Sequence, residues 1–119
     1  MKFCLPPNKS VWLIGDPHLG RRLETGVPLH RRGEREKRQL AKFQAELAED
    51  VDININVGDT FEHPFVGFSV VLDAFMSYRK AAENRPQTMF YIIAGNHDIP
   101  RNLEAVGALD VLEQLLDGI

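Results

Sequence analysis

Three short apolar segments alternate along the chain with longer stretches that have the spacing of amphipathic helices. The apolar segments cover residues 10–15, 53–57 and 89–94, and each one ends in glycine or is followed by it. They are rich in β-branched and aromatic residues, which is typical of strands in a parallel sheet. Asn54 and Asn56 alternate with apolar residues in the second segment, so we expect one face of that strand to be less buried or to border polar groups.

Helix-forming residues fill the stretches between and after the strands. Apolar residues recur at helical spacing over 33–50 and about 66–83, and a third helix, introduced by Pro100 and Asn102, runs to Leu116. The order βαβαβα predicts an α/β fold with a largely parallel sheet and right-handed crossovers. The carboxyl ends of the strands then share one edge of the sheet, where α/β proteins place their ligands.

The composition is that of one compact domain. The 119 residues are 44% hydrophobic and 26% charged, close to the globular average, and we assign residues 1–119 to a single domain. The chain has no apolar run long enough to span a membrane, and its first residues lack the apolar core of a signal peptide. The single cysteine, Cys4, fits a reducing compartment, so we expect a cytoplasmic protein without a membrane partner.

The net charge of −3 is unevenly distributed. Seven basic residues stand against three acidic ones between Arg21 and Arg38, directly after the first polar motif. Such a stretch is typical either of a solvated loop and helix start or of a surface that attracts phosphate. The candidates for phosphate contacts are Arg21, Arg22, Arg31, Arg32 and, further along the chain, His63.

Metal-binding side chains follow all three predicted strands. Asp16 and His18 come after the first strand, Asp59 after the second and Asn96 after the third. Residues two apart on an extended chain point to the same side, so Asp16 and His18 can bind one cation together. The carboxylate of Asp59 can bridge two cations, and the carbonyl oxygen of Asn96 suits a second, harder ion. Oxygen and nitrogen ligands without thiolate favour Mn²⁺, Fe, Zn²⁺ or Mg²⁺.

The two residues after Asn96 have a different chemistry. His97 can donate a proton to a leaving oxygen, and Asp98 can hold the imidazole in one tautomer. Two cations about 3.5–4 Å apart polarise a phosphoryl group and generate hydroxide from bound water. The residues therefore favour metal-assisted hydrolysis of a phosphate ester.

An Asp-x-His pair, a Gly-Asp pair or a Gly-Asn-His-Asp turn is a weak signal by itself. In this order and at strand ends, however, Gly15–Gly20, Gly58–Glu62 and Gly95–Asp98 resemble the first three signature blocks of the calcineurin-like metallophosphoesterases. The spacing, Phe61 and the segment Gly107–Leu112 are most similar to the DNA-repair nuclease branch of that family, the SbcD/Mre11 type. The resemblance spans nearly the whole chain.

This resemblance implies metal-dependent phosphodiester hydrolysis, with DNA as the substrate of an exonuclease or endonuclease in DNA repair. It implies two Mn²⁺ ions as cofactors, with Mg²⁺, Fe or Zn²⁺ as alternatives, and an SbcC/Rad50-like ATPase as partner. Asp16 and His18 would bind the first ion, and Asp59 would bridge the two ions. Asn96 would bind the second ion, and His97 would be the catalytic histidine.

The family pattern continues with a further histidine and a Gly-His-x-His block, which do not occur in these 119 residues. The chain corresponds to the first half of the family's αββα sandwich, so we expect a second metal site that keeps only Asp59 and Asn96. We also expect an oligomer or a complex to cover one face of the sheet. His30 and His63 are the unassigned histidines, and Glu62 stands where the family has aspartate, at a supporting position.

The alternative function is that of a truncated, non-catalytic metallophosphoesterase-like module that binds DNA, a nuclease or its ATPase partner. Loss of the later histidines favours this alternative, whereas retention of the polar residues in all three blocks favours an enzyme. A plain structural subunit is the hypothesis that the intact third block favours least.

Overall fold

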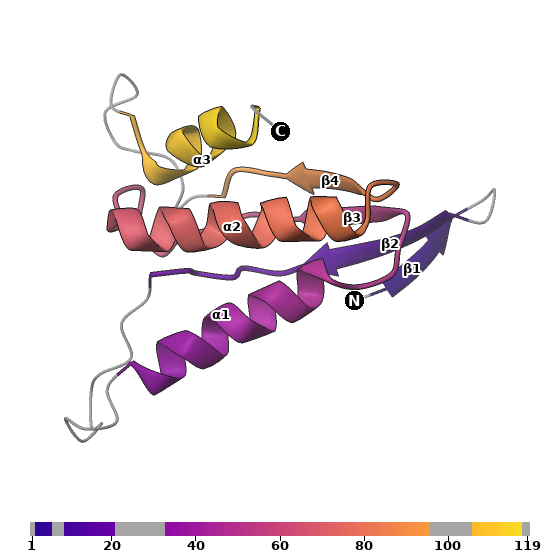
Figure 1. Cartoon of the computed structure of the whole chain (residues 1–119), viewed down its shortest axis with the longest axis horizontal. Coiled ribbons are helices and arrows are strands. Elements are labelled where there is room, and N and C mark those ends of the chain that lie inside the picture. The colour runs from indigo at the N-terminus through magenta and orange to yellow at the C-terminus, as the bar shows by residue number, and fades with distance from the viewer. Residues whose placement is uncertain (1, 6–8, 21–32, 96–105, 118–119) are drawn as a thin grey trace.

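The computed structural model describes residues 2–5, 9–20, 33–95 and 106–117. The elements in these ranges are β1 (Lys2–Leu5), β2 (Lys9–Ile14), α1 (Glu34–Leu47), β3 (Ile53–Asn56), α2 (Phe68–Asn84), β4 (Met89–Ile92) and α3 (Ala108–Leu116). From β2 onward strands and helices alternate as the sequence predicts, and the α/β fold class is confirmed (Figure 1). Of the described helices, none is both long enough and apolar enough to cross a membrane.

The three predicted strands form the parallel part of the sheet. β3 pairs in parallel with both β2 and β4, and Ile14, Asn56 and Ile92 lie in one row across them. The N–H groups of Val57 and Ile93 continue this pairing, donating to the carbonyls of Ile14 and Asn56 at 3.0 and 2.9 Å. All three strands therefore end at the same level, and the residues that follow them share one edge of the sheet.

β1 is an element that the sequence does not predict. It pairs antiparallel with β2, with Lys2 opposite Trp12. A strand of four residues ahead of Pro6 and Pro7 is too short to show an alternation of apolar and polar positions. It adds an antiparallel edge strand to a largely parallel sheet, which is a common combination.

The third helix begins later than the sequence predicts. The backbone N–H of Gly107 donates to the carboxylate of Asp110 at 2.9 Å, which caps the first turn of α3. Val106, which the sequence places inside the helix, therefore lies outside it. The predicted start, at Pro100 and Asn102, lies outside the described residues.

α1 and α2 lie side by side over one face of the sheet (Figure 1). The parallel strands lie in sequence order, so two right-handed crossovers place both helices on the same side. The ring of Tyr78 on α2 contacts Phe43 of α1 and Phe90 of β4 edge-on, at centroid distances of 5.6 and 6.0 Å. The buried core around these rings also contains Ile14, Leu19, Leu47, Phe61, Val71, Ala74, Ala81, Ala108 and Leu112.

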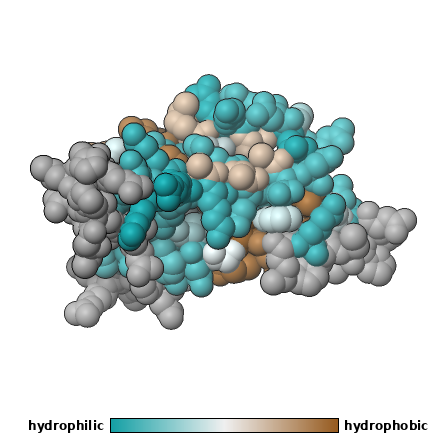
Figure 2. Space-filling model, turned by 90° about the horizontal axis from the view of Figure 1, so that it is seen from below, coloured by the Kyte–Doolittle hydropathy of each residue, from teal (hydrophilic) through white to brown (hydrophobic). Residues whose placement is uncertain are grey.

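The opposite face of the sheet carries apolar side chains in a more open setting. Met89, Tyr91 and Ile93 alternate along β4 and its extension and are 56%, 49% and 52% exposed, and Val57 after β3 is 42% exposed. Figure 2 shows the molecule from below, the side on which α1 lies in Figure 1, and its described surface there is mostly hydrophilic with smaller apolar areas. Among the described residues, the side chains that β4 and its extension place on this opposite face are therefore much less buried than those beneath the helices.

Replacing Leu112 by alanine should destabilise the fold by about 2–5 kcal/mol, because it removes a fully buried side chain where α3 packs on α2. Leu115→Ala, on the same helix but 37% exposed, is the matched control and should cost much less. Urea unfolding followed by circular dichroism measures both changes. Equal losses of stability would contradict this packing of α3.

Candidate metal centre

Asp16, His18 and Asp59 come together at the carboxyl edge of the sheet. Each offers one ligand atom, and these atoms all lie within 4.8 Å of one another. Asp16 and His18 lie on the loop after β2, and Asp59 lies on the turn after β3. Two carboxylates and an imidazole are ligands for a divalent cation of the manganese, iron or zinc type. This metal group could therefore hold one such ion.

The same three residues have an uncommon backbone conformation. Asp16, His18 and Asp59 are the non-glycine residues with positive φ among those described, at 41°, 49° and 49°. The left-handed region is unfavourable for residues with a side chain, although Asp and His enter it more readily than most. Such conformations persist where the surrounding structure holds them, and they cluster at functional sites. Here the three residues with positive φ are the same three that offer ligand atoms.

Backbone hydrogen bonds join the two turns directly. The N–H of His18 donates to the carbonyl of Asp59 at 2.9 Å, and the N–H of Leu19 donates to that of Thr60 at 2.8 Å. Leu19 and Phe61 form an isolated bridge and are 3% and 0% exposed, so they anchor both turns in the core. The spacing between His18 and Asp59 is thus set by the main chain.

α1 supports the first turn from the side. The Nε2 group of Gln39 donates to the carbonyls of Pro17 and His18, both at 2.9 Å, where the irregular loop has no strand ladder. Lys42 lines, with Gln39, Asp16 and His18, a hollow of about 210 Å³ beside the metal group. No sequence pattern marks Gln39 or Lys42, because their roles arise only when α1 packs beside the loop.

The carboxylate of Glu62 lies beside the imidazole of His18. Its Oε2 lies 3.1 Å from Nδ1 of His18, and the two side chains are 21% and 25% exposed. A carboxylate near one ring nitrogen of a histidine can fix the tautomer, which would leave the other nitrogen for a metal ion. The sequence places Glu62 at a supporting position, and this contact shows that a glutamate at that position reaches the histidine.

Gly95 packs against Asp59 from the end of β4. A Cβ atom at Gly95 would collide with both the carboxylate and the backbone nitrogen of Asp59. Gly58 is less tightly confined, since a Cβ there would lie 3.2 Å from Cα of Gly95. The ends of β3 and β4 thus meet without side chains between them, and the place of the Asp59 carboxylate depends on glycine at position 95.

Part of the predicted site is not described by the structure. His63 is described; it is exposed, lines a separate hollow with Gly20 and Glu62, and does not belong to the metal group. Its contact with phosphate stays a prediction. The predicted residues outside the described ranges are Arg21, Arg22, His30, Arg31, Arg32, Asn96, His97 and Asp98.

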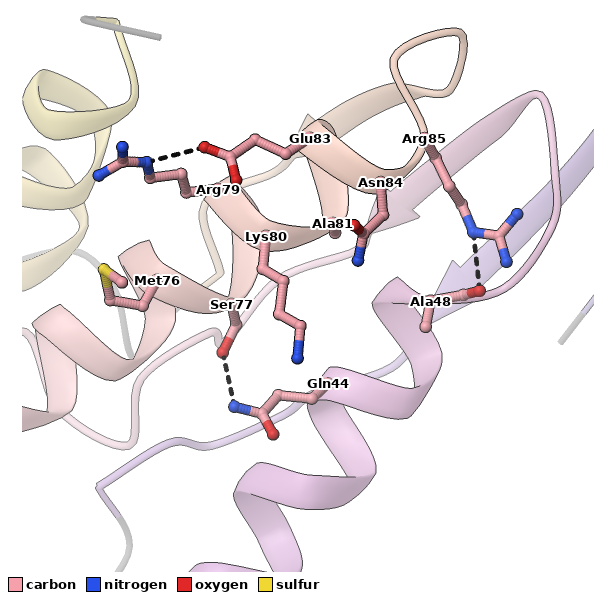
Figure 3. A pocket seen from close by; sticks show the side chains of 10 residues that line it. All are labelled: Gln44, Ala48, Met76, Ser77, Arg79, Lys80, Ala81, Glu83, Asn84 and Arg85. Carbon is pink, nitrogen blue, oxygen red and sulfur yellow. Dashed lines mark hydrogen bonds and ion pairs between the residues drawn. The ribbon is translucent and has the colours of Figure 1, made fainter.

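A groove of about 690 Å³ lies between the C-terminal halves of α1 and α2 (Figure 3). Its polar side chains bond to one another. Gln44 of α1 donates to Ser77 of α2 at 3.2 Å, and Arg79 pairs with Glu83 within α2 at 3.1 Å (Figure 3). Crossover helices run antiparallel to their strands, so this end of the helices lies toward the amino ends of the strands. None of the three metal-group residues lines this groove, and the candidate site is at the other edge of the sheet.

The family model described as calcineurin-like phosphoesterase matches residues 9–116. The match runs from β2 to α3 and contains the whole metal group. No curated protein matches the chain.

Gly95→Ala should weaken Mn²⁺ binding and destabilise the fold by about 1–3 kcal/mol, because the new methyl group overlaps Asp59. Gly15→Ala is the matched control, since a Cβ at this other strand end meets no atom within 4 Å. Calorimetric Mn²⁺ titrations and thermal melts of both variants measure these effects. A Gly95→Ala chain that binds Mn²⁺ as tightly as the Gly15→Ala chain would show that the contact with Asp59 does not matter.

Glu62→Ala should lower the affinity for Mn²⁺ about 10- to 100-fold, because His18 loses the carboxylate that orients its ring. Glu83→Ala removes a comparable carboxylate from an exposed pair with Arg79 and should leave Mn²⁺ affinity unchanged. Calorimetry on both proteins provides the comparison. Equal affinities in the two variants would exclude an orienting role for Glu62.

Proposed function

The chain belongs to the calcineurin-like phosphoesterases, and we propose that it hydrolyses phosphodiester bonds of DNA with two Mn²⁺ ions. Metal-dependent hydrolysis of a phosphoester is the activity that membership of this family implies. The observation that carries the proposal is the metal group of Asp16, His18 and Asp59. It supplies two anionic oxygens and an imidazole from two separate turns, which suits a cation that must also bind a phosphate oxygen.

Each residue of the site has a proposed task. Asp16 and His18 would hold the first ion, Glu62 would keep the imidazole of His18 in one orientation, and Asp59 would serve as a ligand of both ions. Bound ions of this kind polarise the phosphoryl group and lower the pKa of a coordinated water. From the sequence, Asn96 is the further ligand of the second ion, and His97, supported by Asp98, donates a proton to the leaving oxygen.

DNA is the proposed substrate because cationic residues gather near the site in the sequence. The stretch from Arg21 to Arg38 has an excess of basic residues and follows the first block directly. Lys42, one of the residues around the hollow beside Asp16 and His18, adds a described cation close to the metal group. Cations beside a hydrolytic centre bind the phosphates that flank the scissile bond, and this favours a polymer over a small monoester.

The partners follow from the same proposal. The likeness of the three blocks to the SbcD/Mre11 type supports a role in DNA repair with an SbcC/Rad50-like ATPase in the cytoplasm. Met89, Tyr91 and Ile93 expose apolar area on one face of the sheet, and we propose that a complex or an oligomer covers it.

Asp59→Asn should abolish both Mn²⁺ binding and hydrolysis, because the amide removes the negative charge that two ions would share. His97→Ala should keep Mn²⁺ but lose about 10²- to 10⁴-fold in turnover, as expected for a lost proton donor. Calorimetry with Mn²⁺ and hydrolysis of bis-p-nitrophenyl phosphate in the same samples measure the two properties separately.

The matched control for the first variant is Asp73→Asn, which neutralises an exposed aspartate on α2 outside the metal group. It should bind Mn²⁺ and hydrolyse the substrate as the unaltered chain does. Mn²⁺ binding without turnover in the unaltered chain would favour the non-catalytic module, and unchanged turnover in His97→Ala would remove His97 from the mechanism.

A further inference from the structure

Asn56 has an uncommon position for an asparagine. It is the last residue of the central strand β3, faces the helices and is 0% exposed. Strands of a parallel sheet are typically apolar where they are buried, and a buried amide is tolerated only where it finds hydrogen-bond partners. The partners of Asn56 therefore indicate what the residue does.

The side chain of Asn56 spans the turn that carries Asp59. Its Oδ1 accepts a hydrogen bond from the N–H of Gly58 at 3.3 Å, one residue before Asp59. Its Nδ2 donates to Oγ1 of Thr60 at 2.9 Å, one residue after Asp59. A single amide thus holds the residues on both sides of the metal-group carboxylate, in the way that asparagine side chains stabilise turns.

This turn needs such support. Gly58 and Asp59 have φ angles of 132° and 49°, so two consecutive residues have positive φ. An aspartate released from this conformation would return to the commoner regions of φ and ψ, and its carboxylate would leave the metal group. Backbone bonds from His18 to Asp59 and from Leu19 to Thr60 join the two turns, but neither of them reaches Gly58. The Asn56 amide bonds to Gly58 and to Thr60 together.

Tyr78 connects the turn to the core. Nδ2 of Asn56 also donates to the hydroxyl oxygen of Tyr78 at 3.3 Å. Tyr78 is 3% exposed, and its ring is fixed edge-on against Phe43 and Phe90. Burial raises the pKa of Tyr78 above its usual range, outweighing the hydrogen bond from Asn56, so the hydroxyl keeps its proton. The amide is therefore held by a rigid, neutral partner from α2.

We propose that Asn56, held by Tyr78, is a positioning residue that keeps the Asp59 carboxylate in the geometry that metal binding requires. The inference rests on the proposed function, in which Asp59 is a metal ligand. By this inference, metal binding also depends on Tyr78 of α2, a core residue that lies outside the metal group.

Asn54 offers a matched control for this role. It lies two residues earlier on the same face of β3 and is 1% exposed. Its Nδ2 donates to the carbonyl of Glu46 on α1 at 3.0 Å, not to the turn. Asn54→Ala and Asn56→Ala therefore remove the same chemical group from comparable buried positions.

The experiment is Mn²⁺ binding by the full 119-residue chain, measured by calorimetry and by the electron paramagnetic resonance signal of Mn²⁺, well below the melting temperature of each variant. Asn56→Ala should weaken Mn²⁺ binding about 10- to 100-fold, the usual cost of losing a group that orients a ligand. Asn54→Ala should lower the melting temperature about as much as Asn56→Ala does. Its Mn²⁺ affinity should stay that of the unaltered chain.

Equal Mn²⁺ affinity in the unaltered chain and in Asn56→Ala would overturn the positioning role and leave the proposed function intact. No Mn²⁺ binding by the unaltered chain would overturn the proposed function and this inference together. If Asn56→Ala does not fold, Tyr78→Phe decides, because it removes only the hydroxyl that holds the amide. That variant should bind Mn²⁺ more weakly than the unaltered chain, and an unchanged affinity would overturn the inference.

Discussion

The metal group depends above all on the pairing of two turns that leave neighbouring parallel strands. β2 and β3 end in the same row of the sheet, and the pairing continues beyond them through the bonds from His18 to Asp59 and from Leu19 to Thr60. His18 and Asp59, one candidate ligand from each turn, are thereby placed by main-chain hydrogen bonds. The further contacts of Gln39, Asn56 and Gly95 then support the two turns in this arrangement.

The hydrophobic core extends into the two turns that carry the metal group. Leu19 and Phe61 continue the core to within one or two residues of His18 and Asp59 and are almost completely buried. Tyr78 contributes its ring to the same core and its hydroxyl oxygen to Asn56. Because side chains in a packed interior can shift only little, these contacts also restrict the backbone of the turns. Gly95 restricts Asp59 as well, because a residue without a side chain can lie directly against it.

The sequence predicts what depends on local pattern and leaves out what depends on packing. Apolar segments that end in glycine predict three strands, and the polar residues that follow two of them do converge in the structure. β1 has too few residues to show a period, and the cap at Gly107 shortens the third helix. The contacts of Gln39 and Asn56 arise between elements far apart in the sequence or within a buried turn, so no spacing rule reveals them.

The site also carries a cost that its proposed cation would offset. All three residues of the metal group have positive φ, and carboxylate oxygens of Asp16 and Asp59 lie within 4.8 Å of each other. Like charges at that separation repel, and the strained turns add to the free energy that the core must supply. A divalent cation held by both carboxylates would offset this repulsion, and a ligand that binds only the folded chain stabilises it by mass action. The paired carboxylates that repel each other in the free chain would therefore also be the ligands that attract the proposed cation, and its binding would be coupled to the folding of these two turns.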